Sequence, residues 1–112
     1  MGKYQIGEFE EIVLLVVAAL HGNAYGVTIK QTIEGRLSRK VSVGALQACL
    51  KRLEEKGYLS ARNGEANAIR GGRPKRYFEI TAYGKKVLEA TREVRNQLWS
   101  EIPEVVLQLK IT

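Results

Sequence analysis

Between Ser42 and Leu59 the chain reads SVGALQACLKRLEEKGYL. Ser42 is a good N-cap, because its hydroxyl can accept a hydrogen bond from a free amide of the first helical turn. Gly57 is a good stop, because glycine readily adopts the left-handed conformation that ends a helix. Apolar residues recur at steps of three and four, which marks the face that we expect to be buried: Val43, Leu46, Leu50 and Leu53. Cys49 lies beside this stripe and is expected to be a small buried hydrophobe rather than a reactive thiol.

Two helices are expected before this stretch, and a hairpin and one long helix after it. The first helix covers residues 7–21, with acidic residues at its start, and the second covers 25–37, with Asn23 or a neighbour as its cap. Strands are predicted at 58–62 and 75–80, and Thr81 should cap a helix that reaches about Ile102. The predicted fold class is α+β and mostly helical: a winged helix-turn-helix of three helices and a two-stranded wing, followed by a long C-terminal helix.

Length and composition predict one compact unit. The chain has 112 residues, 45% of them hydrophobic and 27% charged, which suffices for one modest core and leaves no room for a separate ligand-sensing domain. Residues 1–80 are expected to form the winged-helix part and 81–112 the dimerisation helix and tail. A single cysteine allows no intramolecular disulfide, and the apolar run at 12–20 is too short to span a bilayer. We therefore expect a cytoplasmic protein without a membrane partner.

The positive charge is concentrated in one segment. Residues 36–76 carry 11 Lys and Arg against 3 Glu, a net charge of +8, whereas the whole chain has a net charge of +6. Segregated positive charge of this kind favours a polyanionic partner such as double-stranded DNA.

The third predicted helix carries the residues that we expect to face DNA. Small residues would allow close approach to the bases, and the amide of Gln47 can both donate and accept, as the edge of adenine requires. Lys51 and Arg52 are expected to hold phosphates, or alternatively to pair with Glu54 and Glu55 on a solvated face. The predicted DNA-facing residues of this segment are Ser42, Gly44, Ala45, Gln47, Ala48, Lys51 and Arg52.

The predicted hairpin and the last helix supply two further surfaces. Cations suited to phosphates or to a narrow minor groove lie at the end of the hairpin: Arg70, Arg73, Lys75 and Arg76. The last helix has apolar residues at a 4-3-4 spacing, which is typical of a helix pair, although the same stripe could pack on the chain's own core. The residues expected at a dimer interface are Leu14, Val17, Val87, Thr91, Val94, Leu98, Trp99 and Ile102.

Several segments together resemble the PadR family of transcriptional regulators, from about Ile6 to Trp99. They are IGEFE at 6–10, AYG at 24–26, VSVGAL at 41–46, LKRLEEKGYL at 50–59, and GGRPKRYFEIT at 71–81 with Gly84 after it. The last segment is the most specific, because glycines, basic residues, an aromatic pair and a capping Thr occur together. The short C-terminal part is similar to that of the smaller family members, which have a single dimerisation helix.

The resemblance implies a homodimeric winged-helix regulator, usually a repressor, that pairs through its first and last helices and binds inverted repeats. Some family members bind planar aromatic ligands between subunits, which would make Trp99 an effector contact; the simpler interpretation is that Trp99 packs at the interface. One departure concerns Gln47-Ala48, where the family usually has Tyr, often followed by Pro. Either Gln47 reads a different base or this chain binds DNA more weakly.

Other classes of protein are less consistent with the sequence. One His, one Cys and no Asp leave no zinc set and no acid–base pair, so neither an enzyme, a metal site nor a cofactor is expected. The main alternative is a winged-helix module that binds protein or RNA, which should lack the basic residues of the third helix and wing. A peripheral membrane protein would need a basic amphipathic helix, whereas the basic segment here is a helix plus a hairpin.

Overall fold

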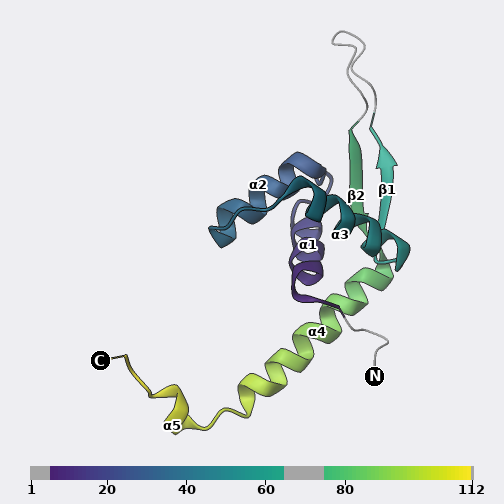
Figure 1. Ribbon diagram of the computed structural model, residues 1–112. Helices are drawn as coiled ribbons and strands as arrows, with labels where there is room; N and C mark the ends of the chain where they lie inside the picture. Colours follow the sequence, from purple (N-terminus) through teal and green to yellow (C-terminus); the bar gives the residue numbers. More distant parts are fainter. Residues whose placement is uncertain (1–5, 65–74, 112) are drawn as a thin grey trace.

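The computed structural model describes residues 6–64 and 75–111 (Figure 1). Three helices come first: α1 (Glu8–Ala19), α2 (Gly26–Leu37) and α3 (Val43–Glu55). Strands β1 (Leu59–Asn63) and β2 (Arg76–Ile80) form an antiparallel hairpin, and α4 (Ala82–Ser100) and the short α5 (Glu104–Leu107) follow. The predicted fold class and order of elements are confirmed.

Local hydrogen bonds explain where the helices begin. The Ser42 hydroxyl accepts from the amide of Ala45 at 3.0 Å, and the Thr81 hydroxyl accepts from the amide of Gly84 at 3.0 Å, so both predicted caps are confirmed. The expected cap at Asn23 is wrong. The hydroxyl of Thr28 instead accepts from the amide of Tyr25 at 3.0 Å and donates to the carbonyl of Asn23 at 2.7 Å.

The core lies where α1 packs against α2, α3 and β2. Leu46, Leu50 and Leu53 of α3 are buried as predicted, and so is Cys49, whose thiol pKa is raised to about 11 by burial. Val43 is a wrong prediction, because its side chain is 61% exposed. It is the first residue of α3, where no other described element covers the helix.

Backbone hydrogen bonds join the hairpin to the start of α2 and close the base of the hairpin. The amide of Phe78, a buried residue of β2, donates to the carbonyl of Ala24 just before α2 at 2.8 Å. At the other end, the amide of Thr81 donates to the carbonyl of Tyr58 at 3.0 Å. The position of β2 relative to α2 and α3 is therefore fixed by the fold.

The first part of α4 packs on the core, and the rest leaves it. Gly84 is buried so close to Tyr58 that an added Cβ would overlap the carbonyl oxygen of that residue, and Val87 is fully buried. From Arg92 onward the helix extends away from the core, as Figure 1 shows, although near its start the Nη2 atom of Arg95 donates to the carboxylate of Glu11 in α1 at 2.8 Å. The radius of gyration is 17.3 Å, against about 13 Å for a compact chain of this length. We call residues 6–91 the body and residues 92–111 the arm.

Candidate DNA-binding surface

The outward face of α3 is uncovered by any other described element. All seven predicted DNA-facing residues of this segment are exposed: Ser42, Gly44, Ala45, Gln47, Ala48, Lys51 and Arg52. Three of these have side chains no larger than a methyl group, so another surface could approach the helix backbone closely. An uncovered helix with such small side chains suits a major groove, which is about 12 Å wide and admits one α-helix.

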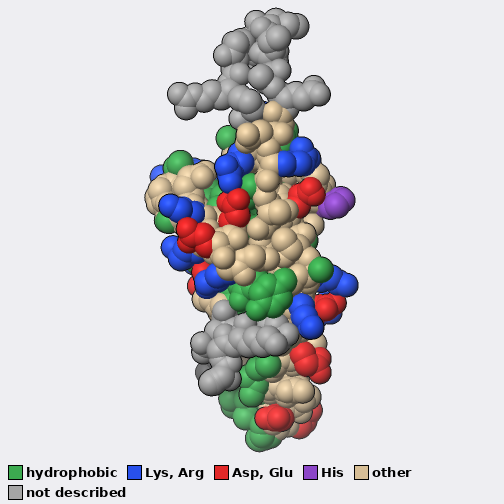
Figure 2. All heavy atoms as spheres, turned by 90° about the vertical axis from the view of Figure 1, so that its right-hand side faces the viewer, with side chains coloured by type: hydrophobic (Ala, Val, Ile, Leu, Met, Phe, Trp, Pro, Cys, Tyr) green, Lys and Arg blue, Asp and Glu red, His purple; other side chains and the backbone are tan. Residues whose placement is uncertain are grey.

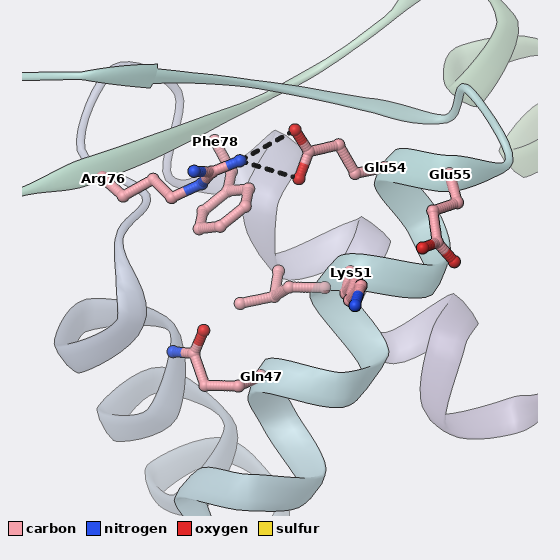
Figure 3. Close-up of a pocket in the computed structure, with 7 residues that line it drawn as sticks. Gln47, Lys51, Glu54, Glu55, Arg76 and Phe78 are labelled. Atoms are coloured by element: carbon pink, nitrogen blue, oxygen red, sulfur yellow. Dashed lines mark hydrogen bonds and ion pairs between the residues drawn. The ribbon is translucent and has the colours of Figure 1, made fainter.

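Gln47 lies on the side of α3 that faces the hairpin. It lines a groove between α3 and β2 together with Lys51, Glu54, Arg76 and Phe78 (Figure 3). An added Cβ on Gly26 would lie 3.3 Å from the Gln47 Nε2 atom, so the amide is close to the start of α2. Gln47 is therefore positioned at the flank of the outward face rather than at its centre.

Arg76 is held by a carboxylate across this groove. Its Nη2 atom donates to both carboxylate oxygens of Glu54, at 3.0 and 2.9 Å, and the two side chains point toward each other in Figure 3. The sequence indicated Glu54 only as a possible partner of Lys51 or Arg52, whereas this pair joins residues 22 positions apart. Such a pair depends on how the hairpin folds back on α3, and no local spacing indicates it.

Arg52 turns away from the groove and toward α1. Its Nε atom lies 3.4 Å from Glu10, and the Nζ of Lys56 lies 3.0 Å from the same carboxylate. The alternative in which Arg52 pairs with Glu54 or Glu55 is therefore wrong. Lys51 has no ion pair among the described residues, so its ammonium group does not have to leave a carboxylate before it binds a phosphate.

Glu10 is a buried carboxylate that connects α1 with the end of α3; its residue is 8% exposed. Burial alone would raise its pKa, but the amide of Gly7 and the charged groups of Lys56 and Arg52 donate to it and lower the pKa below the ordinary value. From the sequence, Glu10 was expected only to be a favourable negative charge at the start of a helix. Its structural role is to hold α3 against α1.

Aromatic side chains support the base of the hairpin. The rings of Tyr25 and Tyr77 meet edge to face at 5.4 Å, and the Lys75 Nζ lies 4.4 Å from the Tyr25 ring centroid. On the other side, the guanidinium of Arg62 lies 4.9 Å from the Tyr77 ring centroid. Of the four cations predicted for the wing, Lys75 and Arg76 are thus placed beside α2 and α3, while Arg70 and Arg73 lie outside the described residues.

The residues predicted for a dimer interface separate into three groups by exposure. Leu14, Val17 and Val87 are at most 1% exposed, and their assignment to an interface is wrong because they form the core of the same chain. Thr91 and Ile102 are partly exposed. Val94, Leu98 and Trp99 are exposed on the arm, at 55%, 59% and 66%, and Figure 2 shows hydrophobic side chains gathered along the lower part of the molecule.

Three packed helices followed by an antiparallel hairpin, with the outward face of the third helix uncovered, define a winged helix-turn-helix fold. The chain matches the transcriptional regulator PadR-like family over residues 13–90 and belongs to that family. It is a transcriptional regulator of the DNA-binding winged-helix type. Family membership confirms the prediction that it is not an enzyme.

Solved structures agree with this assignment. A PadR-like transcription factor from Bacteroides fragilis is 26% identical with a TM-score of 0.67, covering 85% of this chain and 89% of that one. A protein from Streptococcus mutans UA159 is 29% identical with a TM-score of 0.66, covering 92% and 91%. A PadR-like transcriptional regulator from Bacillus cereus shares the fold at 19% identity, with a TM-score of 0.70 and coverage of 91% and 93%. No curated protein sequence matches the chain.

Within residues 6–64 and 75–111 no helix is long and apolar enough to cross a membrane. The same residues contain no group of three or more His, Cys, Asp or Glu side chains that could hold a metal ion.

Proposed function

We propose that this protein is a homodimeric repressor that binds an inverted-repeat operator in double-stranded DNA. The observation that carries the proposal is the uncovered face of α3, small at Gly44, Ala45 and Ala48, with the hairpin and its cations beside it. An uncovered helix of this shape can enter the major groove, while cations beside it neutralise phosphates. Bound near a promoter, the protein would exclude polymerase.

The side chains of α3 and the wing divide between base contacts and backbone contacts. Gln47 is the candidate for reading a base edge, since its amide can donate and accept together. Lys51, Lys75 and Arg76, with Arg70 and Arg73 of the hairpin, are candidates for phosphate contacts, which position a protein without specifying sequence. Arg52 and Arg76 are weaker candidates than the sequence suggested, because Glu10 and Glu54 already hold them.

The arm supports the dimer. Apolar surface is left uncovered on the part of α4 that extends beyond the core, at Val94, Leu98 and Trp99. An apolar patch of this kind is typical of a protein interface. Pairing two arms would bring two copies of α3 into one assembly. Two recognition helices about 34 Å apart, one turn of DNA, fit the two halves of an inverted repeat.

An effector is a second, narrower proposal. Trp99 is 66% exposed near the end of α4, so a planar aromatic molecule could stack on it between two arms. Such a ligand would act by changing the separation of the two α3 helices, since tight binding needs both to fit at once. Packing of Trp99 against the partner explains the same exposure and needs no ligand.

We also propose a cytoplasmic location for the protein. Within the chain, residues 1–80 would serve DNA binding and residues 81–112 would serve dimerisation. A single buried cysteine is compatible with a reducing compartment. The boundary at residue 80 falls just before the Thr81 cap of α4.

The experiment that tests DNA binding is a titration of labelled duplex with the purified protein at several salt concentrations. Counterion release predicts that log K falls linearly with log salt, with a slope of about −0.9 for each neutralised phosphate. A slope of several units would support the proposal. Absence of duplex binding at low salt, together with salt-insensitive binding to a protein or to RNA, would favour the alternative of a winged-helix interaction module.

A further inference from the structure

The groove between α3 and β2 carries opposing charges although it lies in the basic segment of the chain. Lys51 and Arg76 line it, but so do Glu54 and Glu55 (Figure 3). The segment from 36 to 76 has a net charge of +8, whereas the four charged side chains of the groove sum to zero. The charges of this groove are therefore not arranged for maximal electrostatic attraction of DNA.

The Glu54–Arg76 ion pair is open to competition from solvent and ligands. The Arg76 side chain is 55% exposed and that of Glu54 is 34% exposed. Only Nη2 of Arg76 contacts the carboxylate, and the guanidinium lies 5.9 Å from the ring centroid of Phe78, which lies beside the groove. The remaining N–H donors of Arg76 have no hydrogen bond to another described residue that would hold them.

The groove lies where the DNA backbone would pass. If α3 occupies a major groove and the hairpin lies against the flanking backbone, the phosphates between them pass over the space between α3 and β2. A guanidinium binds carboxylate and phosphate through the same planar set of donors. A phosphate in this position must therefore either displace Glu54 from Arg76 or approach a carboxylate of like charge.

We propose that Glu54 is an internal competitor for DNA phosphate, which occupies Arg76 in the free protein and lowers its affinity for duplex of any sequence. This inference rests on the proposed DNA-binding function. The penalty applies equally to every site on DNA, so it shortens binding at all sites by the same factor and leaves the preference for one site over another unchanged. Glu54 thus reduces trapping on non-specific DNA.

The test uses Glu54→Gln, which keeps the shape of the side chain and removes its charge. We expect it to bind non-specific duplex about three- to tenfold more tightly at low salt, the range of one exposed ion pair plus one removed repulsion. The salt slope should steepen by about 0.9, the value for one additional phosphate contact. Thermal unfolding of each variant checks that the fold is retained.

Two further variants isolate the role of Arg76. In a background of Arg76→Gln, the gain from Glu54→Gln should shrink to the part that comes from the removed repulsion, because no guanidinium remains to be released. Glu79→Gln is the matched control: Glu79 lies 3.6 Å from Arg62 on the opposite face of the hairpin, so it removes the same charge and also frees an arginine. We expect its effect on affinity to be smaller than twofold, as for an exposed surface pair.

The outcomes are distinct from those that test the function itself. If the wild-type chain binds no duplex, the DNA-binding proposal fails. If the wild type binds but Glu54→Gln binds equally or more weakly, competition is excluded, and weaker binding would mean that Glu54 positions Arg76 for DNA. Equal gains in Glu54→Gln and Glu79→Gln would also overturn the inference, because they would show a general charge effect.

Discussion

The body and the arm differ in the burial of their apolar side chains. All 15 buried hydrophobic residues of the described chain lie in the body, between Val13 and Val87. In the arm, large apolar residues such as Leu98, Val105 and Leu109 are 59%, 70% and 76% exposed. Hydrophobic burial is the main favourable contribution to folding. The body therefore carries its own stability, while the apolar surface of the arm can stabilise only an assembly.

The largest expected effect sharpens this difference. Leu50→Ala in the body should lower the free energy of unfolding by about 2–5 kcal/mol, because the side chain is 1% exposed and its loss leaves a cavity. Leu98→Ala in the arm should lower it by less than about 0.5 kcal/mol in dilute protein, where arms are unpaired. Urea unfolding of both variants checks the difference, and equal losses would contradict the division into body and arm.

The second prediction concerns assembly. Leu98→Asp should weaken dimerisation by roughly 30-fold or more, since it places a charge in the apolar patch that the partner would cover. Sedimentation velocity across a dilution series measures this. Asn96→Asp is the matched control, because it adds the same charge to an exposed position of α4. A Leu98→Asp variant that stays dimeric at all concentrations would show that the arm is not the interface.

The third prediction tests how the body holds its recognition helix. Glu10→Gln should lower the free energy of unfolding at pH 7 by about 2 kcal/mol, through loss of its hydrogen bonds to charged groups. Because the folded-state pKa of Glu10 is lowered, this stabilisation is present above the ordinary pKa of 4.5 and is lost as pH falls below it. The difference between wild type and variant should therefore shrink in acid.

Its control is Glu8→Gln, in the same first turn of α1. The Glu8 side chain is 78% exposed and lies 4.0 Å from Arg39, so its replacement should have a small effect at any pH. If the two variants lost equal stability, Glu10 would act only through the dipole of α1 and would not hold α3.

The smallest expected effect is chemical. Cys49 is fully buried in the body, and burial raises its thiol pKa to about 11, so little thiolate exists near neutral pH. A thiol reagent should label it slowly in the native protein and quickly in the Leu50→Ala variant, whose core opens more often. Rapid labelling of the wild type would contradict a closed core around α3.

Features of the sequence that act locally predicted much of this fold. Caps at Ser42 and Thr81 depend on residues three positions apart, and the stripe at Leu46, Leu50 and Leu53 depends on helical periodicity, so both were visible. The exposure of Val43 was not, because it depends on where the neighbouring helices stop.

The candidate surface was predicted less completely. The residue types on α3 indicated which face we expect to meet DNA, but the partners of its charges come from distant segments: Glu10 for Arg52, and Arg76 for Glu54. The same holds for Leu14 and Val17, whose apolar character fits a core and an interface equally. Only the packing of α1 shows that they are covered within their own chain.

The most direct test of the central claim is selection of bound duplexes from a random DNA pool by the wild-type protein. The claim is that the arm pairs two bodies so that both α3 helices read DNA together. It predicts enrichment of an inverted repeat whose half-sites are about 10 base pairs apart, centre to centre. Enrichment of a single unrepeated half-site, or recovery of DNA without any motif, would contradict it.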